Sequence, residues 1–228
     1  MKLPENGTGY SCVVCGAPIR GDHFYLQARD ARFCRAHRNL PRCTFCGLPA
    51  GYRMEEINYC ALCRRDAVSD DRAVNLAQKS MVQLRRLGLK FAVKPGFSLA
   101  SRSPRSGDIT GHSILGWTNV TTVDNRISDI QIIVRRHMPA MNMIATFVHE
   151  VGHAYACTLG VKDEYLEEGF CEALAYYHLS MHVPNSELVV HQIAGRSDSY
   201  GEAFRACSTV IRRHGFPALI TKLQTANS

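Results

Sequence analysis

The sequence has no long apolar run and no solenoid-type repeat, and its first residues do not have the pattern expected of a secretory leader. Its apolar stretches are broken by Arg, Gln or Glu within about ten residues, whereas a membrane-spanning helix needs about 20. The opening residues, MKLPENGTGYSC, lack the basic and then apolar organisation of a secretory signal. We therefore expect a cytoplasmic protein without a membrane span. In such reducing surroundings cysteines serve metals or catalysis, not disulfides.

The composition is that of an ordinary soluble protein with a basic excess. The 228 residues are enough for one large domain or two modest ones, and 46% of them are hydrophobic and 21% charged. The formal net charge is +7, and the excess lies in the first part of the chain, before about residue 90. A charge of this size is compatible with nucleic acid, with an acidic protein partner, or with a solvated face.

Four cysteine pairs of the type C-x-x-C or C-x-x-H precede residue 64: CVVC, CRAH, CTFC and CALC. Residues 1–66 contain too few aliphatic side chains for a core of their own. We therefore expect bound metal ions to stabilise the fold of this segment. Adjacent pairs predict two closed, four-ligand sites, which are typical of structural zinc. The ligands of these two sites are Cys12, Cys15, Cys34 and His37, and then Cys43, Cys46, Cys60 and Cys63.

The other cysteines and one histidine receive no metal role. Cys157, Cys171 and Cys207 each lie in an apolar helical stretch, so we expect them to be buried by packing. His23 lies between two of the pairs and is expected at the surface.

The remainder of the chain predicts an α+β fold. Ser69 can cap a connecting helix within residues 67–93, which Gly88 would end. A peptidase domain is expected from 94 to 228, mainly helical with a small sheet. Its expected elements are a loop over 94–112, strands at ILGWTNV and RISDIQIIV, helices from about Pro139 to Thr158 and from about Glu167 to His182, and two or three more helices.

The stretch FVHEVGHAY has the H-E-x-x-H pattern of metalloproteases. On a helix, His149 and His153 lie on one face and can offer two imidazole nitrogens to one Zn²⁺. Glu150 then lies beside the ion as a general base. A surface helix could carry the same residues without a role, but the apolar flanks MIATFV and AYA indicate a buried helix. Buried polar groups are unfavourable unless something satisfies them.

A third zinc ligand is expected from the next helix, in LEEGFCEALAYY. This stretch resembles the gluzincin pattern, in which a glutamate before a glycine completes the site. The resemblance implies Glu168 as the ligand and Glu167 as the less favoured choice. Glu172 lies one turn further on the same face. It either orients one of the zinc-binding histidines or is an ordinary helix carboxylate.

Taken together, the two signals resemble the LIM-containing, ubiquitin-activated zinc peptidases that limit plant organ growth, the Da-one and Da-one-related family. The stretches that carry this resemblance are CRAHRNLPRCTFC, YCALCRRDAV, FVHEVGHAY, EEGFCEALAYY and YGEAFR. The first module is LIM-like, although its second pair is C-x-x-H and not H-x-x-C, and the gap to Cys43 is longer. The resemblance implies an endopeptidase with one catalytic and two structural zinc ions. Ubiquitin-interacting helices do not appear in this sequence, so we expect a compact stand-alone relative and do not carry over the ubiquitin link.

The oxyanion of the reaction needs a donor besides the metal. Tyr200, in the family-like stretch YGEAF, is the candidate, and its competitors are Tyr155, Tyr165, His178 and His191. One of the two predicted strands is expected to bind the substrate at its edge. Trp117 is either a wall of the cleft or core, and the loop over 94–112 is expected to cover the site.

Two other functions stay open. In the first, the LIM-like module is an adaptor for a protein partner and the peptidase domain is idle or autoinhibited. In the second, which the sequence favours less, the basic module binds nucleic acid, although the sequence lacks clear aromatic interleaving among the arginines.

Overall fold

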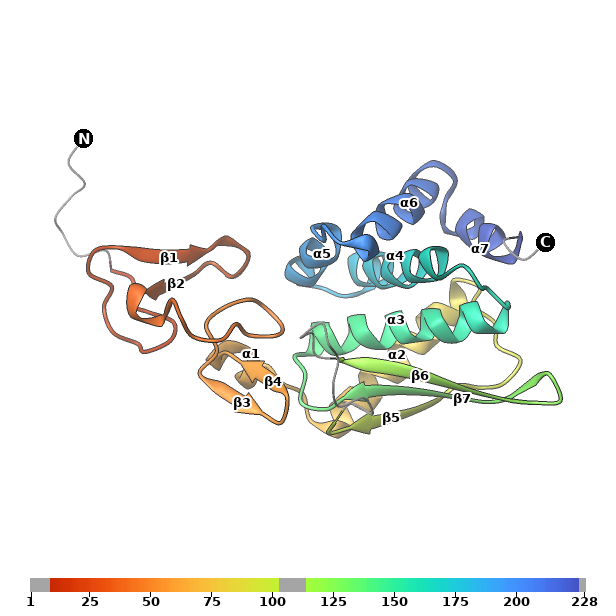
Figure 1. Ribbon diagram of the computed structural model, residues 1–228, viewed down its shortest axis with the longest axis horizontal. Coiled ribbons are helices and arrows are strands. Elements are labelled where there is room, and N and C mark those ends of the chain that lie inside the picture. Colours follow the sequence, from red (N-terminus) through yellow and green to blue (C-terminus); the bar gives the residue numbers. More distant parts are fainter. Residues whose placement is uncertain (1–8, 103–113, 226–228) are drawn as a thin grey trace. The chain divides into compact units, whose positions relative to one another are not determined.

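A computed structural model describes residues 9–102 and 114–225 (Figure 1). The chain divides into two compact units, Met1–Ala67 and Val68–Ser228. Helices and small sheets both occur, so the expected mixed α+β class is confirmed.

The N-terminal unit is built from short hairpins and turns. Its strands have only three or four residues each, so they cannot bury a large core by themselves. Phe45, Leu48, Ile57 and Tyr59 form the small buried centre. The elements are β1 (His23–Leu26), η1 (Gln27–Arg29), β2 (Ala31–Cys34), η2 (Arg35–His37), β3 (Tyr52–Met54), β4 (Ile57–Tyr59) and α1 (Ala61–Arg65), with β1 antiparallel to β2 and β3 to β4.

The second unit contains a three-stranded sheet with strand order β5-β7-β6. The two strands expected from sequence are confirmed as β6 (Gly116–Val123) and β7 (Arg126–Arg135), which are antiparallel. Their hairpin turn at Asp124 and Asn125 has positive φ at both positions, as two-residue hairpins favour. In the strand order of this sheet, β6 forms one edge.

The third strand, β5 (Gly96–Ala100), corrects the expectation of a loop over 94–112. It pairs in parallel with the Gln131–Arg135 part of β7. A Cβ at Gly96 would lie only 2.5 Å from the end of the flexible Gln131 side chain, which would have to move aside. Residues 103–112 of the expected loop lie outside the described residues. The expectation that this loop covers the site rests on those residues.

Six helices complete the described part of the second unit (Figure 1). The central helix α3 packs against β6 and β7 on one side and against α4 on another, and α4 also packs against α6. The helices are α2 (Asp70–Arg86), α3 (Ala140–Thr158), α4 (Glu164–His182), α5 (Glu187–Ala194), α6 (Ser199–His214) and α7 (Phe216–Thr225).

Side-chain caps mark the start of two of the predicted helices. Ser69 accepts a hydrogen bond from the Arg72 backbone N–H, which confirms it as the cap of α2. The helix α3 agrees with its expected bounds. In contrast, α4 starts three residues earlier than expected, because the Asp163 side chain accepts the Leu166 N–H and caps the helix there.

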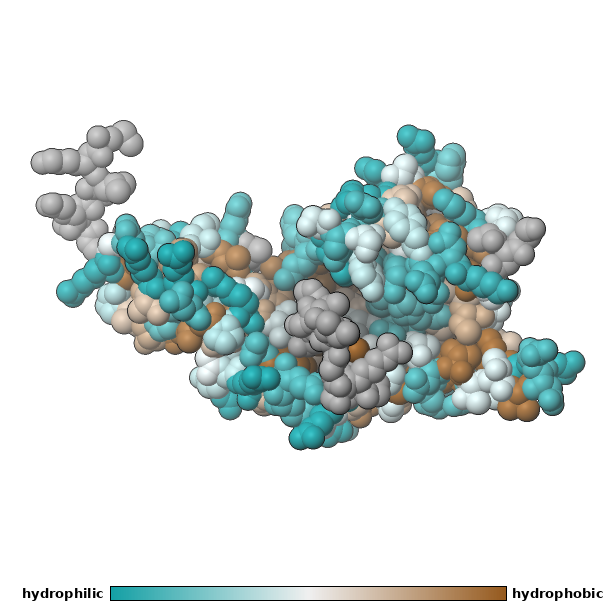
Figure 2. Space-filling model, in the orientation of Figure 1, coloured by the Kyte–Doolittle hydropathy of each residue, from teal (hydrophilic) through white to brown (hydrophobic). Residues whose placement is uncertain are grey.

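Apolar side chains lie mostly inside. On the face seen in Figure 2 hydrophilic residues predominate, and hydrophobic ones form small separate patches. The largest fully buried side chains include Phe147 of α3 and Phe170 of α4. Among the described helices, none is both long and apolar enough to cross a bilayer.

Candidate metal centres

The first predicted zinc site is assembled. The ligand atoms of Cys12, Cys15, Cys34 and His37 all lie within 4.8 Å of one another. The imidazole Nδ1 of His37 is 2.9 Å from Cys34 Sγ and 3.7 Å from Cys12 Sγ. Gly16, at φ +72°, lets the chain turn back after the first pair, where its N–H donates to the Cys12 carbonyl. Burial raises the pKa of Cys12, but backbone N–H groups outweigh it and lower the pKa to about 6. A thiolate is the form that binds zinc.

The second predicted site is also assembled and lies deeper. Cys43, Cys46, Cys60 and Cys63 are all buried, with ligand atoms within 4.8 Å of one another. The Cys60 thiol caps α1 by accepting the Cys63 N–H. Each site offers four ligands of the kind that structural zinc prefers, so these groups can hold two zinc ions. His23 is exposed, as expected.

A third group of possible ligands lies between α3 and α4. The Nε2 atoms of His149 and His153 are 3.2 Å apart. The Glu168 carboxylate reaches across from α4, with Oε2 3.4 Å from His149 Nε2 and Oε1 3.8 Å from His153 Nε2. Zinc bonds of 2.0–2.1 Å in a tetrahedron put ligand atoms about 3.3 Å apart. The three side chains therefore fit one zinc ion.

Two features of this third group point to a cation. The Glu168 Oε2 atom is buried and has no hydrogen bond from the described part of the chain. Burial lowers the pKa of His149, but the carboxylates of Glu168, Glu172 and Glu150 outweigh it and raise the pKa to about 9. A site that raises the pKa of a histidine in this way, and in which the buried Glu168 Oε2 atom has only the 3.4 Å ion pair with His149, suits a divalent ion.

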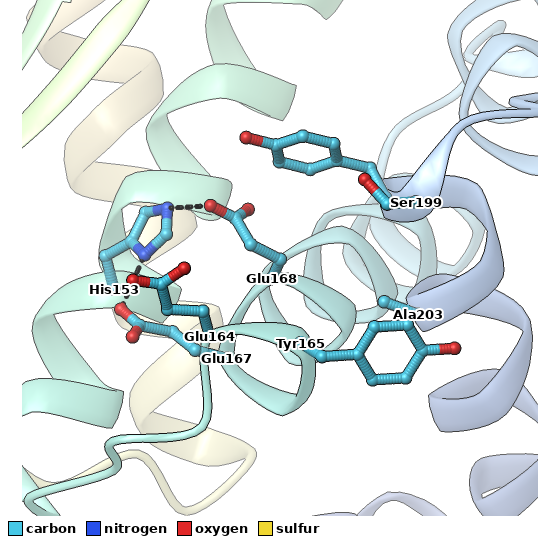
Figure 3. Close-up of a pocket in the computed structure, with 8 residues that line it drawn as sticks. His153, Glu164, Tyr165, Glu167, Glu168, Ser199 and Ala203 are labelled. Carbon is cyan, nitrogen blue, oxygen red and sulfur yellow. Dashed lines mark hydrogen bonds and ion pairs between the residues drawn. The ribbon is translucent and has the colours of Figure 1, made fainter.

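Glu167, the less favoured zinc ligand, contacts the outer side of the site. Its Oε1 atom is 2.7 Å from His153 Nδ1 (Figure 3). A carboxylate in this position accepts the Nδ1–H and leaves the Nε2 lone pair for a metal. The sequence left open whether Glu172 has this orienting role or is an ordinary helix carboxylate. Glu172 accepts a hydrogen bond from Arg196 Nη1 at 2.5 Å. Sequence analysis did not single out Arg196, because its loop between α5 and α6 carries no motif.

Cys171 offers an alternative fourth ligand. Its Sγ lies within 4.8 Å of the histidine nitrogens. Burial raises the pKa of this thiol well above its usual value, and the surrounding carboxylates raise it further. The thiol also packs on α3 where Gly152 has no side chain. Cys171 and Cys207 are buried as expected, but Cys157 is exposed, so the packing prediction is wrong there. Cys157 follows His153 by one helical turn and shares its open face.

Glu150 is positioned by the edge strand. It is 6% exposed, and the Thr118 hydroxyl oxygen on β6 lies 2.9 Å from its Oε2 atom. Gly116 lets β6 approach this closely, since a Cβ there would be 2.9 Å from Glu150 Cγ and 2.6 Å from Thr146. Burial raises the pKa of Glu150, and the Thr118 hydrogen bond and the nearby histidines oppose this shift.

A cleft surrounds the third group. One part of about 480 Å³ is lined by His153, Glu164, Tyr165, Glu167, Glu168, Ser199, Tyr200 and Ala203 (Figure 3). In Figure 3, His153 lies between Glu167 and Glu168, and Tyr165 lies on the α4 side. Residues of β6, among them Trp117, line another part together with Glu150 and His153. Trp117 is thus at the cleft wall.

The candidate oxyanion donors differ in whether they line the cleft. Tyr200 lines the cleft next to both His149 and Glu150. Tyr155 is buried and packs against Phe91 and Phe170. His178 is also fully buried, and His191 is exposed, with its Nδ1 2.7 Å from the Glu187 carbonyl. Of the five candidates, only the two tyrosines at 165 and 200 line the described cleft.

Comparisons with known proteins give no match for this chain. No protein-family model, curated protein or solved structure matches it.

Proposed function

We propose that this protein is a zinc-dependent endopeptidase, and that His149, His153 and Glu168 hold its catalytic metal. The observation that supports the proposal is the spacing of the three ligands, 3.2 to 3.8 Å between the facing atoms. Three protein ligands leave one position of a tetrahedral ion open, as catalytic zinc sites require. The two cysteine sites are closed and keep a structural role.

A zinc ion in the third site would polarise a peptide carbonyl and lower the pKa of a water molecule. The protein supplies the proton acceptor, Glu150. Its Oε2 atom receives the Thr118 hydrogen bond, so Oε1 is the oxygen that takes the proton from the attacking water. Burial raises the pKa of this carboxyl, which suits it to return the proton to the leaving amide nitrogen.

Tyr200 is the donor that we propose for the negative charge on the carbonyl oxygen. It lies in the first turn of α6, where the side chain of Asp198 caps the helix. The Arg196 guanidinium lies 4.5 Å from the centre of the tyrosine ring and is itself bonded to Asp198. These contacts fix the direction in which the phenol points.

The edge strand β6 provides a place for the substrate backbone. Its outer edge has no neighbouring strand among the described residues, and Thr118 and Asn119 line the cleft beside Glu150. An extended peptide can add to such an edge through main-chain hydrogen bonds, which recognise a chain irrespective of most side chains. This favours protein substrates over small molecules.

The substitution Glu150→Gln tests the proposal. It preserves the size of the side chain but removes the proton acceptor. We expect an unchanged zinc content and a loss of about 10²–10⁴-fold in hydrolysis, the usual contribution of a general base. The probe is a quenched-fluorescence peptide library with cleavage sites mapped by mass spectrometry. Glu202→Gln, on the exposed side of α6, is the control. Undiminished hydrolysis by Glu150→Gln contradicts the assignment.

One feature of the N-terminal unit favours a second function, the capture of a protein partner. The Arg32 guanidinium lies 3.8 Å from the ring centre of Tyr10 and 4.4 Å from that of Tyr25. Both rings are about half exposed, at 47% and 49%. Tyrosine and arginine dominate the hot spots of protein interfaces. An adaptor would capture a partner without turnover by the intact protein, whereas a nucleic-acid binder would show salt-dependent affinity for RNA or DNA.

A further inference from the structure

Arg29 connects the two cysteine sites of the N-terminal unit. In the chain it lies between Cys15 and Cys34, within the segment that forms the first site. Its Nη2 atom, however, lies 3.2 Å from the Sγ atom of Cys63, a ligand of the second site. Cys46 of the same site also attracts this guanidinium. The side chain thus crosses from one site to the other.

The charge of the second site explains why a guanidinium is useful there. Four thiolates around one Zn²⁺ carry a net charge of −2, and all four of these cysteines are buried. A buried net charge is unfavourable unless hydrogen-bond donors and an opposite charge compensate it. The Cys63 backbone N–H donates to Cys60 Sγ at 3.4 Å, and Arg29 adds a charged donor.

The β1–β2 turn holds Arg29 in this position. Arg29 ends the turn η1, and Asp30 follows at φ +43°, a left-handed conformation that aspartate tolerates. The Asp30 carboxylate accepts a hydrogen bond from the Tyr25 hydroxyl at 3.0 Å and contacts Arg32 at 3.5 Å. From this turn, β2 runs directly to Cys34, a ligand of the first site.

We propose that Arg29 is a positioning residue that couples the two zinc sites. Deprotonated cysteines, the form that would hold zinc in the second site, would keep the guanidinium against Cys63, which fixes the β1–β2 turn and hence the position of Cys34 in the first site. The two sites are therefore loaded cooperatively. This inference does not depend on peptidase activity, and its test does not use it.

The test compares Arg29→Met with Arg20→Met in the full chain. Met keeps the length of the side chain without charge or donors, and Arg20 is exposed in the same segment. Zinc release to 4-(2-pyridylazo)resorcinol is followed by absorbance, and the freed cysteines are identified by alkylation and mass spectrometry. We expect Arg29→Met to release the zinc of the second site about 10–100-fold faster, as for other residues that support metal ligands, and Arg20→Met to behave as wild type.

Coupling is tested by adding Cys60→Ser, which disables the second site. With Arg29 present, this change should speed the alkylation of Cys34 in the first site, and with Met at position 29 it should add little. Equal zinc release by Arg29→Met and wild type overturns the proposal, as does an equal effect of Cys60→Ser in both backgrounds. If Arg29→Met does not fold, zinc release is compared between Arg29→Lys and its control Arg20→Lys. Faster zinc release by the first supports the coupling, and equal release refutes it.

Discussion

The hydroxyl oxygen of Thr118 lies 2.9 Å from the Oε2 atom of the Glu150 carboxylate, which joins the edge strand of the sheet to the helix of the proposed metal site. The same oxygen is 2.9 Å from the Glu150 backbone carbonyl. Strand and helix are therefore linked at the residue proposed as the base. Any change at this link acts on both the proton acceptor and the strand proposed to bind substrate.

Replacing Thr118 by Val removes this link while preserving shape. The hydrogen bond lowers the pKa of Glu150, so its loss raises that pKa further. Because the base must be ionised, the acid limb of kcat/KM should move to higher pH. We expect kcat to fall about 10–100-fold, since hydrogen bonds to charged groups contribute about 1.5–3 kcal/mol. Thr121→Val, on an exposed part of the same strand, is the control. An unmoved acid limb contradicts the link.

Glu167→Gln tests the support of His153. The amide can present its NH₂ group to Nδ1 and so favour the wrong tautomer, which would occupy Nε2 with a proton. We expect the affinity of the third site for zinc to fall about 10–100-fold, while both cysteine sites stay loaded. Zinc titration against a chelator measures this. Glu164→Gln, in the exposed first turn of α4, is the matched control, and equal affinities for the two variants would exclude the orienting role.

Gly152→Ala tests the close contact of α3 and α4. A Cβ at this position would lie 2.7 Å from Cys171 Sγ and 3.0 Å from Cys171 Cα, so the helices must separate. Overpacking of this kind destabilises by about 1–3 kcal/mol, and separation also moves Glu168 away from the histidines. Denaturant unfolding and zinc content measure both effects. Gly51→Ala has open space around its Cβ and should change neither.

The burial of His178 predicts that the folded protein loses stability in acid. It is fully buried, and neither ring nitrogen has a hydrogen-bond partner in the described part of the chain. Burial, with the nearby His182, lowers its pKa from 6.5 to about 4. Between these values the unfolded chain binds the proton more readily, so stability should fall as pH decreases from about 6.5 to 4. The loss has an upper bound of about 3 kcal/mol.

His178→Leu isolates this contribution, because leucine has a similar volume and no titrating group. We expect the variant to be at least as stable as wild type at pH 7 and to lose less stability between pH 6.5 and 4. Urea unfolding across this range is the measurement, with the exposed His191→Gln as the control. Parallel stability curves for wild type and His178→Leu would show that His178 is not the source.

The metal ligands were the part of the site most open to prediction from sequence. Helical spacing puts His149 and His153 on one face whatever surrounds them, and the paired C-x-x-C spacing brings cysteines together by local turns. Both follow from short-range geometry. The two cysteine groups assemble as predicted.

The partners of those ligands could not be predicted in the same way. Whether Glu167 or Glu172 contacts a histidine depends on how α4 is rotated against α3, and Thr118 reaches Glu150 from a separate strand. Cys157 was wrongly expected to be buried, because its helix is apolar overall but its own position faces the cleft. The strand β5 was not predicted, since its short run begins at Gly96 directly after Pro95, and proline and glycine usually mark loops.

Anomalous X-ray scattering at the zinc edge tests the central claim most directly. The account predicts an ion about 2.0–2.2 Å from His149 Nε2, His153 Nε2 and one Glu168 oxygen, with the fourth position free of protein ligands. Two further ions should lie in the cysteine sites. No ion between α3 and α4, or an ion that Cys171 closes as a fourth protein ligand, would contradict the proposed catalytic centre.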